Sequence, residues 1–148
     1  MTQPVVTLVT PAHNQGAYLR ETMLSVLAQD YPALEYIVID DGSTDETWAV
    51  AQAVAAEHAG RVQVVTQVNA GQSATLNRGW GMARGAMLGY LSSDDRLEPD
   101  AVSGLVAALQ ATPACAVAYG DFRIVDAQGR FIRLAQAPAF DRRALLED

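Results

Sequence analysis

The fold is decided by the stretch Tyr36-Ile37-Val38-Ile39-Asp40-Asp41-Gly42-Ser43. Its four consecutive apolar residues are typical of a strand covered on both faces, as in a parallel sheet. Two acids and a glycine end the run. Ser43 followed by Glu46 forms a capping box, which predicts a helix from Ser43 to about Glu57. The stretch therefore predicts a strand, an acidic turn and a helix in direct succession.

The same alternation continues on both sides of this stretch. Strands are predicted at residues 5–10, 62–65 and 87–91, and shorter ones at 116–119, 122–125 and 131–134. Apolar residues at helical spacing predict helices through 19–27, over about 73–84 and from near Pro99 to Leu109. A turn is predicted at 126–129. This order specifies an α/β fold with a mostly parallel sheet flanked by helices, which binds ligands beyond the carboxyl ends of its strands.

Two acidic pairs fall at such strand ends, Asp40-Asp41 and Asp94-Asp95. Adjacent carboxylates repel each other unless a cation or hydrogen-bond donors occupy the site. Helix capping is the alternative explanation for an acid at such a position. It suffices for acids in predicted first turns, namely Asp45, Glu46 and Asp100. A hard cation such as Mg²⁺ or Mn²⁺, carried in by a diphosphate, suits a short acidic motif of this kind.

Composition narrows the possible functions. The net charge of −7 argues against a nucleic-acid partner, and the absence of lysine excludes a P-loop and Schiff-base chemistry. The single cysteine, Cys115, lies in an apolar run and is predicted to be a buried, reduced thiol. No apolar run is long enough for a transmembrane segment, and the N-terminus leaves no room for a signal peptide. We expect a cytoplasmic protein, with the inner face of the membrane as a peripheral location.

Taken in order, the motifs resemble family 2 of the inverting glycosyltransferases, which have the GT-A fold. The first strand with Pro11 and Asn14 is similar to the first motif of that family, and residues 37–45 are similar to the second. Residues 69–79 resemble the third motif. Leu91-Ser92-Ser93-Asp94-Asp95 resembles the D-x-D-type metal motif, with Ser93 in place of the first acid. The resemblance covers about residues 5–130.

The resemblance implies metal-assisted transfer of a sugar from a nucleotide-sugar donor to an acceptor hydroxyl with inversion. The nucleotide-sugar-binding residues that it implies are Pro11, Asn14, Asp41, Gly71, Asn77 and Asp94, with Asp95 as the ligand of Mn²⁺ or Mg²⁺. Asp41 would contact the base, and Asp94 the ribose or sugar. Arg78 is either part of the site or a cation on the helix surface. His13 stands where the family commonly has an aromatic residue. The implied donor is a UDP-sugar, the acceptor a glycan or lipid-linked sugar, and the process cell-envelope polysaccharide biosynthesis.

The catalytic base of the family lies well downstream of the metal motif, so we place it beyond Asp148. The later acids Asp121 and Asp126 are interpreted as turn residues. Residues 1–148 are therefore predicted to be one nucleotide-sugar-binding domain, truncated at its C-terminal side. A non-catalytic nucleotide or nucleotide-sugar binding module on the same fold remains an alternative. A receiver-like signalling domain is disfavoured, because it uses a lysine and places its acidic pair after the first strand, which here ends in Thr10-Pro11.

Overall fold

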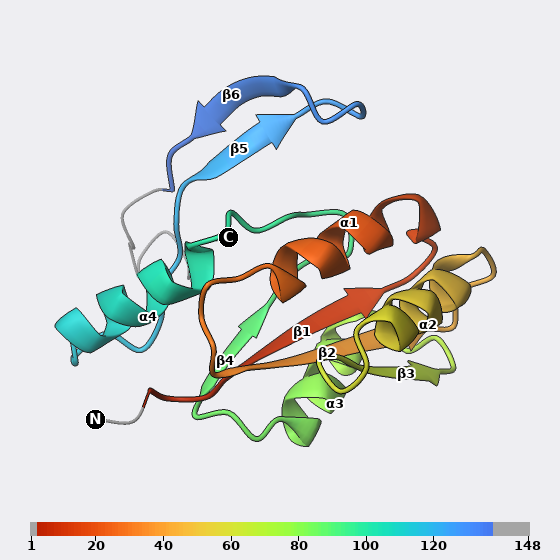
Figure 1. The fold of residues 1–148 in the computed structure, drawn as a ribbon, viewed down its shortest axis with the longest axis horizontal. Helices are drawn as coiled ribbons and strands as arrows, with labels where there is room; N and C mark the ends of the chain where they lie inside the picture. The colour runs from red at the N-terminus through yellow and green to blue at the C-terminus, as the bar shows by residue number, and fades with distance from the viewer. Residues whose placement is uncertain (1–2, 138–148) are drawn as a thin grey trace, which may run out of the picture. The chain divides into compact units, whose positions relative to one another are not determined.

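The computed structural model describes residues 3–137, and the chain divides into two compact units, residues 1–103 and 104–148. The first unit contains a four-stranded parallel sheet in the order β3-β2-β1-β4 (Figure 1). Its strands are β1 (Val6–Ala12), β2 (Leu34–Asp41), β3 (Gln63–Gln67) and β4 (Met87–Tyr90). The connecting helices are α1 (Gly16–Leu27), α2 (Thr47–Glu57) and α3 (Gln72–Met82). The predicted parallel sheet with flanking helices is therefore confirmed.

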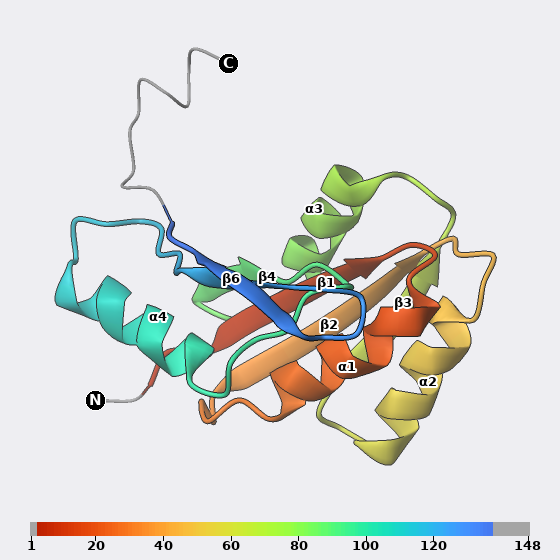
Figure 2. The same cartoon turned by 90° about the horizontal axis from the view of Figure 1, so that it is seen from above.

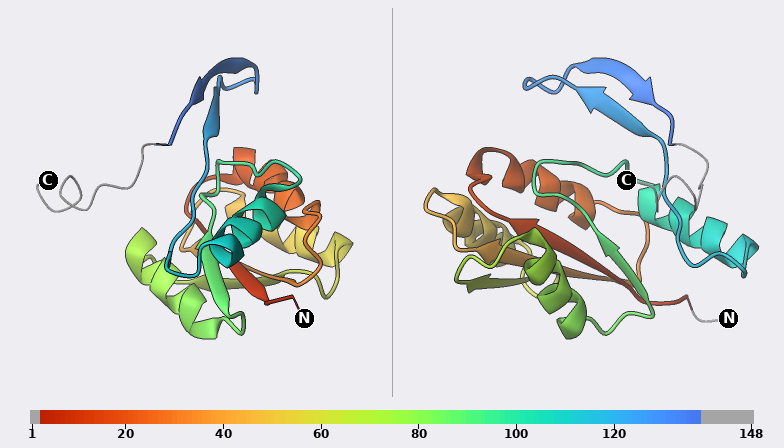
Figure 3. Two further views of the ribbon diagram at one scale, coloured as in Figure 1. Left: turned by 90° about the vertical axis from the view of Figure 1, so that its left-hand side faces the viewer. Right: turned by 180° about the vertical axis from the view of Figure 1, so that it is seen from behind.

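Helices cover both faces of the central strands, as the continuous apolar run in β2 predicts. α1 and α2 lie on one face and α3 on the other (Figures 2 and 3). Successive strand residues point to opposite faces, so the central strands β1 and β2 supply both cores. The core under α1 and α2 includes Leu8, Val38, Leu19, Met23 and Val54. The core under α3 is formed by Val9, Ile37 and Ile39 with Leu76 and Trp80.

A close contact between α3 and the sheet is made at Gly79. A Cβ added to this glycine would lie 2.5 Å from Cγ1 of Val9 and 3.3 Å from Cδ1 of Ile39. The missing side chain lets the helix backbone approach the two central strands. This close contact determines the distance between α3 and the sheet. The N-terminal end of α3 lies at the edge of the sheet where the acidic pairs lie.

The second unit contains most of α4 (Ala101–Ala111), which begins in the first unit, and an antiparallel pair of strands. β5 (Phe122–Val125) pairs with β6 (Phe131–Ala135), and both agree with the predicted strands. The predicted turn between them forms as well. Its Asp126 carboxylate accepts hydrogen bonds from the N–H groups of Gln128 and Arg130. Among the described residues, no helix is long and apolar enough to cross a membrane.

Three sequence-based predictions were wrong in detail. The helix predicted from Ser43 begins only at Thr47, because the Ser43 hydroxyl accepts a hydrogen bond from the Asn14 N–H instead of capping its own helix. The N-cap residue is Glu46, and Oδ1 of the preceding Asp45 accepts a hydrogen bond from the Thr47 N–H at 2.9 Å. No strand forms at residues 116–119. Cys115 is exposed, because it lies in an irregular segment after α4 rather than inside a strand.

Replacing Gly79 by alanine should destabilise the first unit by about 1–3 kcal/mol, the usual cost of forcing an extra methyl group into a packed interface. The matched control is Gly81→Ala in the same helix, where an added Cβ meets nothing within 4 Å. That change should be neutral or stabilising by up to about 1 kcal/mol, because alanine is the better helix former. Urea denaturation of both variants measures the difference. Equal effects at the two positions would contradict the close approach at Gly79.

Candidate functional site

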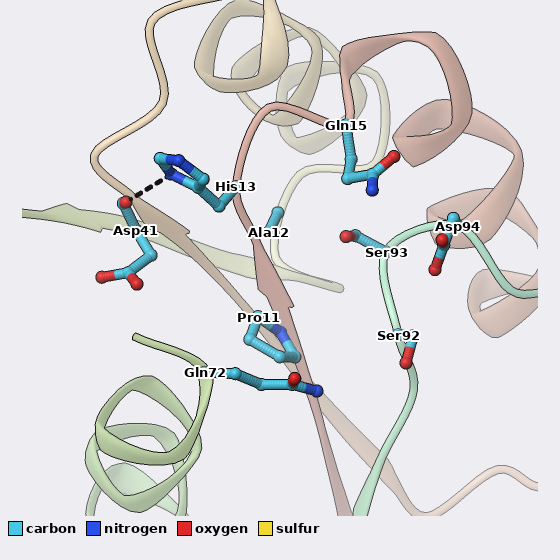
Figure 4. Close-up of a pocket in the computed structure, with 9 residues that line it drawn as sticks. All are labelled: Pro11, Ala12, His13, Gln15, Asp41, Gln72, Ser92, Ser93 and Asp94. Carbon is cyan, nitrogen blue, oxygen red and sulfur yellow. Dashed lines mark hydrogen bonds between the residues drawn. The ribbon is translucent and has the colours of Figure 1, made fainter. Parts of the chain in front are cut away.

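The acidic strand ends and the start of α3 meet at the carboxyl edge of the sheet. A pocket of about 340 Å³ opens there. It is lined by Pro11, Ala12, His13, Gln15, Asp41, Gln72, Ser92, Ser93 and Asp94 (Figure 4). His13 and Asp41 lie on one side of this pocket, and Ser93 and Asp94 on the other. Three predicted nucleotide-sugar residues, Pro11, Asp41 and Asp94, are thus brought to one cavity.

Asp41 is the last residue of β2, and its side chain accepts hydrogen bonds from the loop before α3. Its Oδ1 accepts hydrogen bonds from Nε2 of Gln67 at 2.6 Å and from the Ala70 N–H at 2.9 Å. Its Oδ2 accepts from the Gly71 N–H at 2.9 Å. Gly71 has a φ of +85°, a left-handed conformation that favours glycine, and it directly precedes α3. The predicted site residue Gly71 therefore shapes this loop, although it does not line the pocket.

The environment of Asp41 keeps its carboxylate ionised. Burial raises the pKa of the Asp41 carboxyl, but the hydrogen bonds from Gln67, Ala70 and Gly71 outweigh burial and hold the pKa below its usual value. Oδ2 accepts the bond from Gly71, and the Thr75 hydroxyl also helps to lower the pKa of the Asp41 carboxyl. This carboxylate is among the groups that line the pocket.

Arg78 acts on Asp41 through the side chain of Gln67. Nη1 of Arg78 donates to Oε1 of Gln67 at 2.8 Å. This contact orients the Gln67 amide so that its Nε2 faces Asp41 and Oγ1 of Thr75. The neighbouring Asn77 is exposed on α3 and is not among the residues that line the pocket. Its predicted role in binding stays a prediction.

His13 forms one wall of the pocket in a defined tautomer. Its Nδ1 lies 2.8 Å from the Asp41 carbonyl oxygen (Figure 4). Since a carbonyl only accepts, Nδ1 carries a proton in this contact, and in the neutral ring Nε2 is then an acceptor. Nδ2 of Asn14 lies 3.2 Å from this Nε2 and can donate to it. The ring is thus held beside Asp41, the residue that the family resemblance predicts to contact the base.

Asn14 connects the loop after β1 to the loop after β2 and is not among the residues that line the pocket. Its φ of +52° is in the left-handed region, which asparagine tolerates better than most residues. Its side-chain Oδ1 accepts from the Thr44 N–H at 2.8 Å, and its own N–H donates to Oγ of Ser43 at 3.0 Å. Nearby, Oδ2 of Asp45 accepts from the Gly16 N–H at 3.1 Å. The two loops therefore fix each other at this edge of the sheet.

The second acidic pair lies on the loop that follows β4. The Asp95 N–H donates to the Ser92 carbonyl at 3.1 Å, which closes a turn. Ser93 is buried within this turn, whereas Asp94 and Asp95 are exposed. Asp94 lines the pocket and Asp95 does not. Partial burial, with a further contribution from the Asp94 charge, raises the pKa of the Asp95 carboxyl.

The chemistry of this pair fits a hard divalent cation brought by a ligand. Among the described residues, no group donates a hydrogen bond to either carboxylate, and the raised pKa of Asp95 reports unfavourable negative charge. No cluster of three His, Cys, Asp or Glu side chains able to hold a metal occurs within residues 3–137. A cation here would need further ligands such as phosphate oxygens and water, as Mg²⁺ commonly takes.

Sequence reasoning did not single out Gln15, Gln72 and Ser92 as lining residues. Gln72 could have been found, because it directly follows the glycine that precedes α3 and so stands at the carboxyl edge. Gln15 has no comparable signal. Its place at the pocket follows from the hydrogen bond of its N–H to Oγ1 of Thr47, a contact between distant parts of the sequence.

Two solved structures that share this fold contain a nucleotide-sugar. The mannosyltransferase PcManGT of Pyrobaculum calidifontis, solved with GDP-Man and Mn²⁺, matches with a TM-score of 0.70 and 26% identity over 74% of this chain and 33% of that one. TarS of S. aureus, solved with UDP-GlcNAc, matches with a TM-score of 0.64 and 25% identity over 72% of this chain and 31% of that one. The fold is thus of the GT-A type, as predicted. The chain belongs to glycosyl transferase family 2, whose sequence profile matches residues 7–146.

Curated relatives are similar over most of this chain but are much longer. The O-antigen biosynthesis protein RfbC of Myxococcus xanthus is 37% identical over 129 residues, which are 86% of this chain and 10% of that protein. The chondroitin synthase of Escherichia coli is 36% identical over 87% of this chain and 19% of its own length. The chain therefore spans a tenth to a fifth of these two relatives.

The stability contributed by Asp41 should depend on pH. In Asp41→Asn, an amide N–H₂ replaces one acceptor oxygen, so a donor of the 67–71 loop loses its partner. We expect a loss of about 1–3 kcal/mol at pH 7. Since the folded-state pKa is lowered, the contribution of the carboxylate is present above about pH 4 and is lost as the pH falls through that lowered pKa. The difference between the parent and Asp41→Asn should therefore shrink in acid.

Urea denaturation of the parent and Asp41→Asn at a series of pH values measures this difference. The control is Glu57→Gln, which removes an exposed ion pair with Arg20. It should have a much smaller effect than Asp41→Asn at neutral pH. A parent–Asn difference that stays constant into acid would contradict the role of the ionised Asp41.

Proposed function

We propose that this chain forms the donor-binding part of an enzyme that transfers a sugar from a nucleotide-sugar to an acceptor hydroxyl with inversion and with the help of a divalent metal. The observation that carries the proposal is that Asp41 and Asp94, from the ends of two different strands, line one pocket. Membership in glycosyl transferase family 2 and the nucleotide-sugars in the neighbouring structures support this proposal.

The pocket has two chemically different sides, which suit the two halves of such a donor. On one side, the carboxylate of Asp41 and the imidazole of His13 line the pocket. These groups suit a base with an N–H donor, and we assign the base to this side. On the other side, Asp94 presents a carboxylate without a partner among the described residues. We assign it to ribose or sugar hydroxyls, which donate hydrogen bonds.

Asp95 would hold the metal, Mn²⁺ or Mg²⁺, together with diphosphate oxygens and water. The metal, when bound, supplies charge stabilisation for the diphosphate leaving group. Asp94 beside it would orient the donor. The neighbour solved with Mn²⁺ and GDP-Man supports a divalent cation in this class of fold. UDP-sugars are the donors we favour, and a glycan or lipid-linked sugar is the acceptor class that we infer from the named relatives.

The acceptor side needs a base that accepts the hydroxyl proton. Two acids of the second unit are already used locally. Asp126 accepts from Nε of Arg130 at 2.7 Å as well as from backbone N–H groups of its turn, and Asp121 accepts from the Ala137 N–H at 2.9 Å. These bonds support the interpretation of Asp126 as a turn residue, whereas the bond of Asp121 joins the start of β5 to the residues after β6. We propose neither acid as the base and keep the expectation that it is supplied from outside residues 1–148.

Asp95→Ala should abolish the tightening of UDP or GDP binding by Mn²⁺ or Mg²⁺, because it removes the proposed protein ligand. The fold should persist, since the side chain is exposed. Isothermal titration calorimetry with and without metal tests this expectation. The control is Asp100→Ala, another exposed acid nearby, which should keep the metal effect. An unchanged metal effect in Asp95→Ala would place the metal elsewhere.

The chain of 148 residues should bind a nucleoside diphosphate with metal and yet fail to transfer sugar. Loss of general-base assistance typically lowers a rate by about 10²–10⁴, and loss of the acceptor pocket removes positioning as well. The test pairs a binding measurement with a UDP-release assay over a panel of donors and acceptors. Acceptor-dependent turnover would show that the base lies within the chain. Binding without turnover in a longer chain that includes the acceptor region would favour the non-catalytic binding module.

A further inference from the structure

Helix α1 and the turn after it hold the segment that carries the second acidic pair. Oγ1 of Thr22 donates to the Ser93 carbonyl at 2.8 Å. Oγ of Ser25 accepts from the Leu97 N–H at 3.1 Å. Two residues beyond the end of α1, Nε2 of Gln29 donates to the Glu98 carbonyl at 2.7 Å. Hydrogen bonds from successive turns of this helix and from the turn after it are thus distributed along residues 93–98.

The bond from Thr22 is the one nearest to the acids. β4 ends at Tyr90, and the last bond to its neighbouring strand runs from the Leu91 N–H to the Val9 carbonyl. Beyond this point the backbone leaves the sheet. Thr22 is 1% exposed and Ser93 is 6% exposed, so the bond between them is shielded from water. Because a buried carbonyl left without a donor is unfavourable, this contact constrains the local backbone.

The side chains of Asp94 and Asp95 have no such support. Within the described residues, nothing donates a hydrogen bond to either carboxylate, and both are exposed. Their placement therefore depends on the backbone of the turn from Ser92 to Asp95. That turn is closed by its own hydrogen bond and is tied to α1 through the Ser93 carbonyl.

We propose that Thr22 is a positioning residue for the metal-binding acids: its hydroxyl fixes the Ser93 carbonyl and so sets where Asp94 and Asp95 stand. This inference rests on the proposed function, because it assumes that these acids serve a cation with a nucleoside diphosphate. Groups that orient metal ligands typically change metal affinity by about 10–100-fold when they are removed. Thr22 should act on the metal response while leaving the base side of the pocket untouched.

The test uses Thr22→Val, which keeps the shape of the side chain and removes its hydroxyl donor. Mn²⁺ is titrated against the whole chain at a fixed UDP concentration, and UDP binding is measured separately without metal. We expect the Mn²⁺ concentration for half-saturation to rise at least about tenfold, with little change in metal-free UDP affinity. Thr22→Ser keeps the hydroxyl and should therefore keep the metal response of the parent chain. Thr22→Cys retains a weak donor and should give an intermediate loss, which keeps the test informative if the valine variant does not fold.

The matched control is Thr7→Val, since Thr7 is an equally buried hydroxyl whose Oγ1 accepts from the Gly85 N–H at 2.9 Å, away from the pocket. It should lower stability without changing the Mn²⁺ titration. A normal Mn²⁺ titration in Thr22→Val, or an equal change in Thr7→Val, would overturn the positioning role and leave the proposed function intact. No metal effect on UDP binding in the parent chain would overturn both.

Discussion

At the carboxyl edge of this sheet, side-chain donors from β3 and backbone donors from two loops converge on two buried carboxylates. Asp40 and Asp41 are adjacent in sequence, yet they do not share donors, because successive side chains of a strand point to opposite faces. Asp40 accepts from the Ser43 N–H and from Oγ1 of Thr66, whereas Asp41 accepts from the loop before α3. The start of α3 and the exit of β2 are therefore held by the hydrogen bonds of these two side chains.

The second acidic pair shows the opposite chemistry at the same edge. Hydrogen bonds lower the pKa of Asp41, whereas partial burial and the neighbouring charge raise that of Asp95. A carboxylate that accepts hydrogen bonds from the protein itself is stabilised by the fold. A carboxylate without such hydrogen bonds can be stabilised by a bound cation or by donors on a ligand. This difference supports the assignment of Asp41 to a mainly organising role, and of Asp94 and Asp95 to external ligands.

Much of the fold and part of the site could be predicted from the sequence. The apolar run of β2 and the alternation of elements gave the parallel sheet, and the strand ends located Asp41 and Asp94. Local patterns failed where a distant residue competes for the same group. Ser43 has the spacing of a cap, but its hydroxyl is taken by Asn14, which lies 29 positions away. The contacts of Gln67 and Arg78 with one another could not be predicted either, since they depend on how α3 packs on β3.

The organising role of Asp41 limits what its replacement can reveal about binding. Removing this carboxylate takes away an acceptor at the base side of the pocket, but it also releases the loop at residues 67–71 and the start of α3. Weaker nucleotide binding in such a variant would have two physical causes that act together. Asp95 is free of this ambiguity, because its exposed side chain holds no other part of the described chain in place. The metal response is therefore the more direct probe of the site, and Thr22 can alter it from the opposite side of the turn without touching the ligand.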